Sequence, residues 1–332
     1  MKLTHINRLC KILGLGQSLS LPTEIFGGLL HNMWQVHTSQ GTFAIKQLAK
    51  NTHSIINNHG SYELTEKIAN LFLQAGIPTI AAIAVNNNYI IDIENESYIV
   101  YPWLNAKPLE KNTASLEQTT KIAKILAKIH AINLQLSTLS NAAYDIHENY
   151  EILALINQSS VLNLPFADDL KKHKSFLLET NDQYIDIIPY LKRNTILSHA
   201  DLNQSNVVWE NSNPIIIDWE FTCKTNPTLE LISMSLDWSR ITNQLNEEIF
   251  LSMLRTYQRA GGYLETNLQA IFYGILGNWL NWIIYNISRC LAKQQSTDKM
   301  TLAIEQVQPG IRNLIYLKSL IPHLIKLIPY SL

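Results

Sequence analysis

The order of apolar and polar positions divides the chain into two parts, and the first part is a small sheet with few helices. Apolar residues spaced three and four apart predict a short amphipathic helix over 4–13 and a longer helix over 60–75. Strand-forming residues over 33–38 and 42–48 flank a Ser-Gln-Gly turn and predict a hairpin, with Lys46 interrupting the second strand. Three further strands are predicted over 81–85, 89–93 and 98–101.

From Pro108 onward the periodicity is mostly helical. Helices are predicted over 115–131, about 148–158, 165–178 and 182–192, with several more between 228 and 325. Only the stretch 207–217 breaks this pattern, because two short apolar runs surround a turn there. The shift in pattern near Pro102 and Pro108 predicts a small lobe over 1–101, a hinge over 102–107 and a larger, mainly helical lobe over 108–332.

Composition narrows the range of partners and compartments. The chain of 332 residues has 16% charged residues and a net charge of −1, so it has no general attraction for nucleic acid or an anionic membrane. Its three cysteines are far apart, which favours a reducing compartment over a disulfide framework, and we expect a cytoplasmic protein without a signal peptide. The apolar stretch 271–287 contains glycines and asparagines, and is more typical of a buried helix than of a membrane span.

The stretch 196–220 gathers polar side chains that suit a cation. Asp201 precedes the predicted hairpin by a few residues, Asn206 stands at its start and Asp218 at its end, while the turn falls at 211–214. A hairpin brings its two ends together, so two carboxylates and an amide oxygen are expected to converge. Oxygen ligands of this kind suit Mg²⁺, which takes one or two protein carboxylates together with substrate phosphates.

An ordered set of motifs covers nearly the whole chain. It consists of Phe26-Gly27-Gly28, Phe43-Ala44-Ile45-Lys46, the run Ser198-His199-Ala200-Asp201-Leu202-Asn203-Gln204-Ser205-Asn206, Ile216-Ile217-Asp218-Trp219-Glu220, and Asn226-Pro227-Thr228-Leu229-Glu230-Leu231. This order resembles the protein-kinase-like fold, and in particular the aminoglycoside phosphotransferase and choline kinase branch. The resemblance implies an α+β protein of two lobes, with a small antiparallel sheet and one helix before a larger helical lobe.

The resemblance also implies how the N-terminal lobe would bind ATP. The Gly27-Gly28 loop would cover the nucleotide, and Lys46 would pair its α- and β-phosphates, held by a glutamate of the following helix. The helical angle relative to the apolar stripe favours Glu63, whereas the family spacing back from the end of that helix favours Glu66. Glu66 is the preferred partner and Glu63 the alternative.

The remaining implied roles lie at the hinge and in the C-terminal lobe. The Pro102 carbonyl and the Leu104 N–H would face the purine base, and the missing N–H of proline does no harm where only an acceptor is needed. Asp201 would accept or orient the proton of the attacking hydroxyl, while Asn206 and Asp218 would hold Mg²⁺.

Departures from the protein-kinase pattern point to a small-molecule kinase. Ala200 stands where regulated protein kinases have arginine, and Trp219-Glu220 follows Asp218 in place of Phe-Gly. The sequence has neither a Gly-x-Gly-x-x-Gly loop nor an Ala-Pro-Glu motif. The prediction is therefore a phosphotransferase with an alcohol group as acceptor; a nucleotide-binding pseudokinase or interaction module is the alternative from another class.

The acceptor is predicted only by class. An aminoglycoside-like substrate comes first, followed by choline, ethanolamine, another amino alcohol, homoserine or a sugar. Residues 200–290 hold nine acidic and five basic residues, and Trp279, Trp282 and Tyr285 share one helical face, features that suit a cationic acceptor as well as an ordinary surface and core. Glu220 is the predicted acceptor-site carboxylate. The bulk of Tyr101 before the hinge predicts that GTP can compete with ATP.

Overall fold

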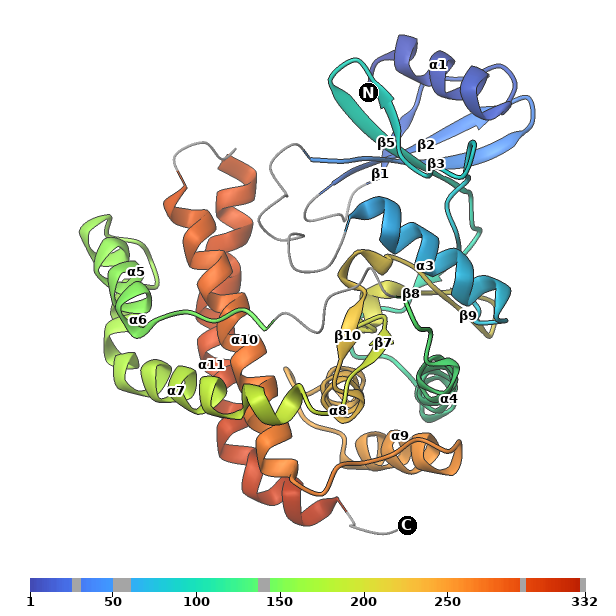
Figure 1. The fold of residues 1–332 in the computed structure, drawn as a ribbon. Coiled ribbons are helices and arrows are strands. Elements are labelled where there is room, and N and C mark those ends of the chain that lie inside the picture. The colour runs from blue at the N-terminus through green and yellow to red at the C-terminus, as the bar shows by residue number, and fades with distance from the viewer. Residues whose placement is uncertain (26–30, 50–60, 137–143, 293–296, 329–332) are drawn as a thin grey trace. The chain divides into compact units, whose positions relative to one another are not determined.

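The structure, a computed structural model, describes residues 1–25, 31–49, 61–136, 144–292 and 297–328 and forms two compact units. The first unit comprises Met1–Asn141 together with Leu197–Lys224, and the second comprises Ala142–Ile196 together with Thr225–Leu332 (Figure 1). The predicted hinge over 102–107 therefore lies inside the first unit. The predicted division into lobes at that hinge stays a prediction.

A five-stranded antiparallel sheet forms the N-terminal part of the first unit. Its strands run in the order β1-β2-β3-β5-β4. They are β1 (Thr23–Ile25), β2 (Asn32–Thr38), β3 (Gly41–Gln47), β4 (Ile91–Ile93) and β5 (Glu96–Pro102). The predicted hairpin is confirmed as β2 and β3, whose tight turn opposes Thr38 to Gly41, a glycine with φ of 138°. Where a strand was expected over 81–85, the structure has single contacts, such as the Ile83 N–H donating to the Val100 carbonyl.

A different helix lies on each face of this sheet. Successive residues of a strand point to opposite faces, so neighbouring residues of β3 face different helices. α1 (Leu3–Leu13) packs Ile6 and Leu9 into one core cluster with Ile45 of β3. The next residue, Lys46, therefore points to the other face, on the side of α3 (Tyr62–Gln74). The Ser61 hydroxyl caps that helix by accepting from the Leu64 N–H at 3.3 Å.

The same unit also contains α4, β6 and most of the short elements around the segment Leu197–Lys224. α4 (Leu116–Ile132) begins with a capping box, in which Ser115 and Gln118 each accept from the other's backbone N–H. The predicted hairpin is confirmed as β8 (Val207–Glu210) and β9 (Asn213–Ile216), and β6 (Lys107–Pro108) pairs with β8. The remaining short elements are β7 (Ile196–Ser198), η1 (Gln204–Asn206), η2 (Trp219–Phe221) and β10 (Cys223–Thr225).

The described part of the second unit is helical. Its helices are α5 (Asn149–Val161), α6 (Ala167–Lys172), α7 (Lys174–Leu191), α8 (Pro227–Trp238), α9 (Glu247–Arg259), α10 (Leu268–Leu291) and α11 (Thr297–Leu327). α10 is buried between its neighbours, as its apolar sequence predicted, and two glycines allow the close packing. An added Cβ at Gly277 would meet Tyr184 Cδ2 at 1.9 Å, and one at Gly274 would meet leucine methyl groups at 2.8 Å. Among the described helices, none is long and apolar enough to cross a membrane.

Candidate active site

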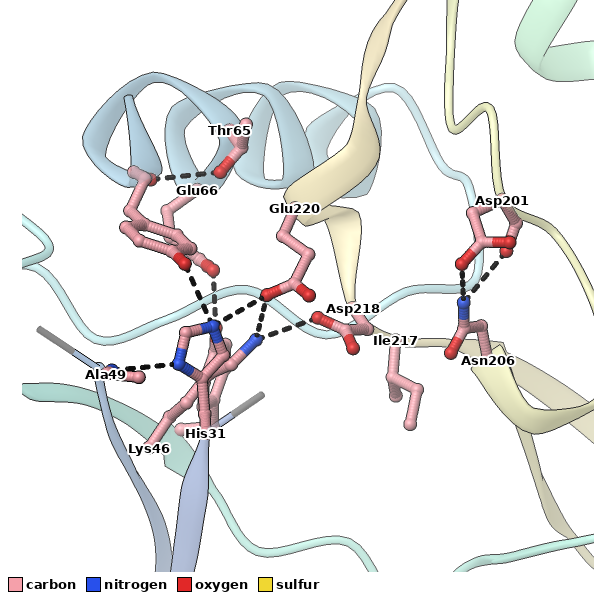
Figure 2. A network of polar contacts seen from close by, with 12 residues as sticks. His31, Lys46, Ala49, Thr65, Glu66, Asp201, Asn206, Ile217, Asp218 and Glu220 are labelled. Atoms are coloured by element: carbon pink, nitrogen blue, oxygen red, sulfur yellow. Dashed lines mark hydrogen bonds and ion pairs between the residues drawn. The ribbon is translucent and has the colours of Figure 1, made fainter. Parts of the chain in front are cut away.

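Lys46 is buried on the face of the sheet opposite α1, where two carboxylates bind it. Its Nζ lies 2.8 Å from Asp218 Oδ1 and 2.8 Å from Glu220 Oε2, and its side chain is 9% exposed (Figure 2). Burial by itself would lower the pKa of Lys46, but the attraction of the two carboxylates and their hydrogen bonds raise it well above its ordinary value. Lys46 is therefore a fixed positive charge, held by residues far away in the sequence.

The two carboxylates stand on a turn that is fixed by aromatic packing. Asp218 has a left-handed backbone (φ 63°) and begins η2, whose Trp219 stacks on Phe72 of α3 at 4.9 Å between ring centroids. The Trp219 Nε1–H donates to Thr79 Oγ1 at 2.7 Å, and Thr79 in turn donates to the Ile216 carbonyl at 2.8 Å. This turn holds Asp218 and Glu220 against Lys46.

Asp201 and Asn206 share a second, adjacent network. Asn206 donates from its Nδ2 to Asp201 Oδ2 and to the Asp201 carbonyl, each at 2.8 Å, and Asn203 Nδ2 donates to Asp201 Oδ1 at 2.8 Å. His199 accepts from the Asp201 N–H at Nδ1 and donates from Nε2 to the Ile217 carbonyl at 3.1 Å. Ala200 between them has φ of 63°, a conformation that L residues seldom adopt and that recurs at functional sites.

The donor set of these networks fits a hard cation. The Asn206 N–H groups bind Asp201, which leaves the amide oxygen for another partner. Asp218 uses Oδ1 for Lys46, which leaves Oδ2, and its side chain is 38% exposed. The Ile217 N–H donates to the Asn206 carbonyl at 3.0 Å, so the hairpin does bring Asn206 next to Asp218. Two or three oxygens suit Mg²⁺ bound to a phosphorylated ligand better than a cage built from protein alone.

Glu220 lies inside this site in contact with Lys46, and its predicted role as an acceptor-site carboxylate stays a prediction. Its side chain is 8% exposed and its Oε2 binds both Lys46 and His31 Nε2, the latter at 3.1 Å. Burial alone would raise the pKa of Glu220. The hydrogen bond from His31 and the attraction of Lys46 outweigh it and lower that pKa to about 2.

The two candidate helix glutamates have other partners than Lys46. Glu63 accepts from the backbone N–H groups of Tyr89 and Ile90, at 2.8 and 3.0 Å. Glu66 is 6% exposed and accepts from the Tyr101 hydroxyl. Burial raises the pKa of Glu66 to about 7, although the Tyr101 hydrogen bond and the nearby Lys46 charge oppose the increase. The observed pairs of Lys46 with Asp218 and Glu220 thus differ from the predicted pair with Glu66.

The predicted hinge residues follow directly from the sheet. Pro102 is the last residue of β5 and lies opposite Phe43 of β3, and the next residue donates its N–H to the Thr42 carbonyl at 3.1 Å. Leu104 is half-buried. The predicted loop residues Gly27 and Gly28 lie outside the described residues.

Three residues of the site were not predicted from the sequence. His31 and Tyr62 contact each other, with the hydroxyl 2.9 Å from His31 Nε2, and Asn203 binds Asp201. A lone histidine before a strand and a lone tyrosine at the start of a helix have no spacing that predicts chemistry. The Asn203 side chain also accepts from the Ser205 N–H at 2.9 Å, a local turn that an Asn-x-Ser pattern could have indicated.

The aromatic residues considered for an acceptor lie in the second unit. Trp282 is 40% exposed and packs on Tyr285 with ring centroids 5.5 Å apart. Arg289 lies over the Tyr285 ring at 5.5 Å, so part of that ring already faces a cation within the protein. Their role in binding an acceptor stays a prediction.

A family model described as "Phosphotransferase enzyme family" matches residues 23–266. A search of curated protein sequences gave no significant match. The solved structures with similar folds include a spectinomycin phosphotransferase bound to ADP and spectinomycin, with a TM-score of 0.75, 14% identity, and coverage of 96% of this chain and 99% of that one.

Two further structures have the same fold. An amicoumacin kinase in complex with AMP-PNP and Ca²⁺ has a TM-score of 0.63 and 13% identity, and covers 94% of each chain. A choline kinase from Cryptosporidium parvum has a TM-score of 0.60 and 13% identity, and covers 98% of each chain. The predicted fold class, a small antiparallel sheet with a mainly helical remainder in a protein-kinase-like arrangement, is confirmed.

Proposed function

The chain belongs to the phosphotransferase enzyme family, and from that premise we propose that it transfers the γ-phosphoryl group of ATP, with Mg²⁺, to a hydroxyl group of a small molecule. The observation that carries the proposal is the linked arrangement of Lys46, Asp218, Asn206 and Asp201 within one compact unit. Phosphoryl transfer requires charge neutralisation and positioning more than covalent participation of the protein, and these side chains supply both.

Lys46 is proposed to bind the nucleotide phosphates. An ammonium group has three N–H donors, and the two carboxylates use two of them, so one remains for a phosphate oxygen. At an effective dielectric constant near 20, a unit charge pair about 4 Å apart attracts by roughly 4 kcal/mol. The phosphate thus gains a partner whose position is already fixed.

The metal would be held by the amide oxygen of Asn206 and the free carboxylate oxygen of Asp218. Bound there, Mg²⁺ would supply positive charge to the phosphate oxygens, where negative charge develops as the bond between the γ-phosphorus and the bridging oxygen breaks. Asp201 is proposed to accept the proton of the attacking hydroxyl. Two asparagine side chains hold its carboxylate in one orientation, so it need not reorganise during the reaction.

The other nucleotide contacts are proposed from the family pattern. The Pro102 carbonyl and the Leu104 N–H would face the base, the Gly27-Gly28 loop would cover the phosphates, and Glu66 would line the back of the site beside Tyr101. GTP is the proposed alternative donor to ATP.

The proposed acceptor is an aminoglycoside-like compound or an amino alcohol. Spectinomycin, which is bound in one similar structure, and choline, after which another similar kinase is named, each carry a hydroxyl group together with an amine or quaternary ammonium group. Ethanolamine, homoserine and sugars complete the set to be tested. A cationic acceptor would also suit the acidic excess of residues 200–290, which hold nine acidic and five basic residues.

The test is ATP consumption in the presence of a panel of these acceptors, measured for the wild type, for Asp201→Asn and for Asp92→Asn. Asp92 supplies the control because it is an exposed carboxylate of the same unit that accepts from Ser97. We expect Asp201→Asn to lose roughly 10²–10⁴-fold in turnover while it still binds the Mg²⁺–nucleotide, and Asp92→Asn to match the wild type. Full turnover by Asp201→Asn would refute the mechanism. Nucleotide binding by the wild type without transfer to any acceptor would favour a nucleotide-binding module.

A further inference from the structure

His31 is a buried histidine that the reaction scheme above leaves without a task. It stands immediately before β2, is 6% exposed, and contacts three groups. Its Nδ1 lies 3.1 Å from the Ala49 nitrogen, and its Nε2 lies 3.1 Å from Glu220 Oε2 and 2.9 Å from the Tyr62 hydroxyl (Figure 2). Burying a polar group costs free energy unless the group is hydrogen-bonded, so each of these contacts matters for stability.

These contacts decide which nitrogen of the neutral ring carries the proton. The Ala49 backbone N–H is a donor, so His31 Nδ1 must be the acceptor and carries no proton. The proton of the neutral imidazole is therefore on Nε2, where it is donated to the Glu220 carboxylate, a group that can only accept. His31 thus orients one carboxylate oxygen, and that same oxygen binds Lys46 Nζ at 2.8 Å.

The chain of contacts connects two strands with the loop that carries Asp218. β3 holds Lys46 directly and His31 through Ala49, which follows the strand, while Glu220 comes from η2. The Glu220 oxygen is 2.8 Å from the lysine and accepts from both sides. Without the donor on His31, Glu220 would keep a charged partner but lose the contact that fixes its direction.

We propose that His31 is a positioning residue of the phosphotransfer site, which acts through Glu220 to aim Lys46 at the nucleotide phosphates. Glu220 is the carboxylate that pairs with Lys46, a role that the family pattern assigned to a helix glutamate. His31 orients this carboxylate by donating to it. The inference rests on the proposed function, since it requires that Lys46 bind phosphate. It predicts a defect confined to the phosphates of the ligand and absent for its nucleoside part.

The chain offers a matched control on the other face of the sheet. His5 of α1 is 1% exposed and, like His31, contacts a tyrosine hydroxyl and a carboxylate, with Tyr98 at 2.7 Å and Glu94 at 3.2 Å. It belongs to the face that carries Ile45, opposite Lys46. Replacing His5 with Phe removes equivalent hydrogen bonds in the same unit without touching the lysine.

The experiment measures the affinity of Mg²⁺–ADP and of adenosine by calorimetry, for the wild type, His31→Phe, His31→Gln and His5→Phe. We expect His31→Phe to weaken Mg²⁺–ADP binding by about tenfold, the effect of losing one hydrogen bond to a charged group, and to leave adenosine binding unchanged. His31→Gln should recover most of the affinity, because its amide N–H can reach Glu220. His5→Phe should bind both ligands as the wild type does.

The outcomes separate the inference from the proposed function. Equal Mg²⁺–ADP affinity of His31→Phe and wild type, or a matching loss of adenosine affinity, would overturn the inference alone. A His31→Gln variant no better than His31→Phe would also overturn it, and this comparison uses thermal unfolding to show that both variants are folded. If the wild type failed to bind Mg²⁺–ADP, the proposed function would fall, and the inference with it.

Discussion

Glu66→Gln is expected to stabilise the protein at alkaline pH, an unusual result for a buried residue in a candidate active site. Glu66 is 6% exposed and accepts from the Tyr101 hydroxyl, and burial raises the pKa of its carboxyl to about 7. At neutral pH the Glu66 carboxyl is therefore about half ionised. Glutamine resembles the protonated carboxyl in shape. It carries no charge, so its burial avoids the cost of removing water from a carboxylate.

The magnitude follows from the difference between the folded and unfolded pKa values. Below pH 4.5 the Glu66 carboxyl is neutral in both states, so its full contribution to stability is present. Between pH 4.5 and about 7 the unfolded chain ionises while the folded chain resists, and the free energy of unfolding falls as pH rises. At about 1.4 kcal/mol per pKa unit, the loss is about 3 kcal/mol above pH 7. The variant avoids this loss, but its amide has one acceptor oxygen where the carboxylate has two for the Tyr101 hydroxyl and the Ala82 backbone N–H. Losing one hydrogen bond worth about 1 kcal/mol leaves a gain of about 2 kcal/mol at pH 8.

Two measurements test this reasoning. Urea unfolding of both proteins at pH 5 and pH 8, followed by tryptophan fluorescence, gives the change in stability, and ¹³C titration of labelled glutamate carboxyls gives the pKa directly, with Glu66 identified as the signal that the variant lacks. Glu63→Gln is the comparison, since this carboxylate accepts two backbone N–H groups and its loss should destabilise the protein at pH 8. A Glu66 signal that titrates near pH 4.5, or a variant no more stable than the wild type at pH 8, would refute the argument.

Two further predictions concern the metal site and the packing of the second unit. Asp218→Asn should remove most of the Mg²⁺ dependence of nucleotide binding, because it deletes a ligand charge and one ion pair of Lys46; calorimetry with and without Mg²⁺ checks this, and an unchanged Mg²⁺ dependence would contradict the assignment. Gly277→Ala should destabilise the protein by roughly 1–3 kcal/mol, because the new methyl group would lie 1.9 Å from the Tyr184 ring. Thermal unfolding measures the loss, which Tyr184→Leu should partly restore, and an unaltered melting temperature would show that α10 shifts without cost.

Local patterns in the sequence were enough to predict the hairpin that carries Lys46 and the hairpin that follows Asn206. The alternation of 42–48 puts Lys46 and Ile45 on opposite faces of a strand, and the structure shows the same arrangement. The hairpin after Asn206 brings that residue within a backbone hydrogen bond of Ile217, which immediately precedes Asp218. These features depend on residues close together in the chain, where backbone geometry decides the outcome.

Contacts between distant elements were not available from those patterns. Lys46 and Glu220 are separated by 174 positions, and nothing in the periodicity of either segment distinguishes Glu220 from Glu66 or Glu63 as the partner of the lysine. The choice is made where Trp219 stacks on Phe72, because this contact holds η2 against α3 and turns Glu220 inward. Glu66 is left to Tyr101.

The sequence by itself determined the family resemblance and the fold class, since these follow from residue type and spacing. The tertiary structure decided which charged groups contact one another. That question turns on packing and burial, because in a space closed to water each carboxylate must find its own donor. His31 shows the difference most clearly: in the sequence it is one histidine among ten, and in the structure it donates to the carboxylate that holds Lys46.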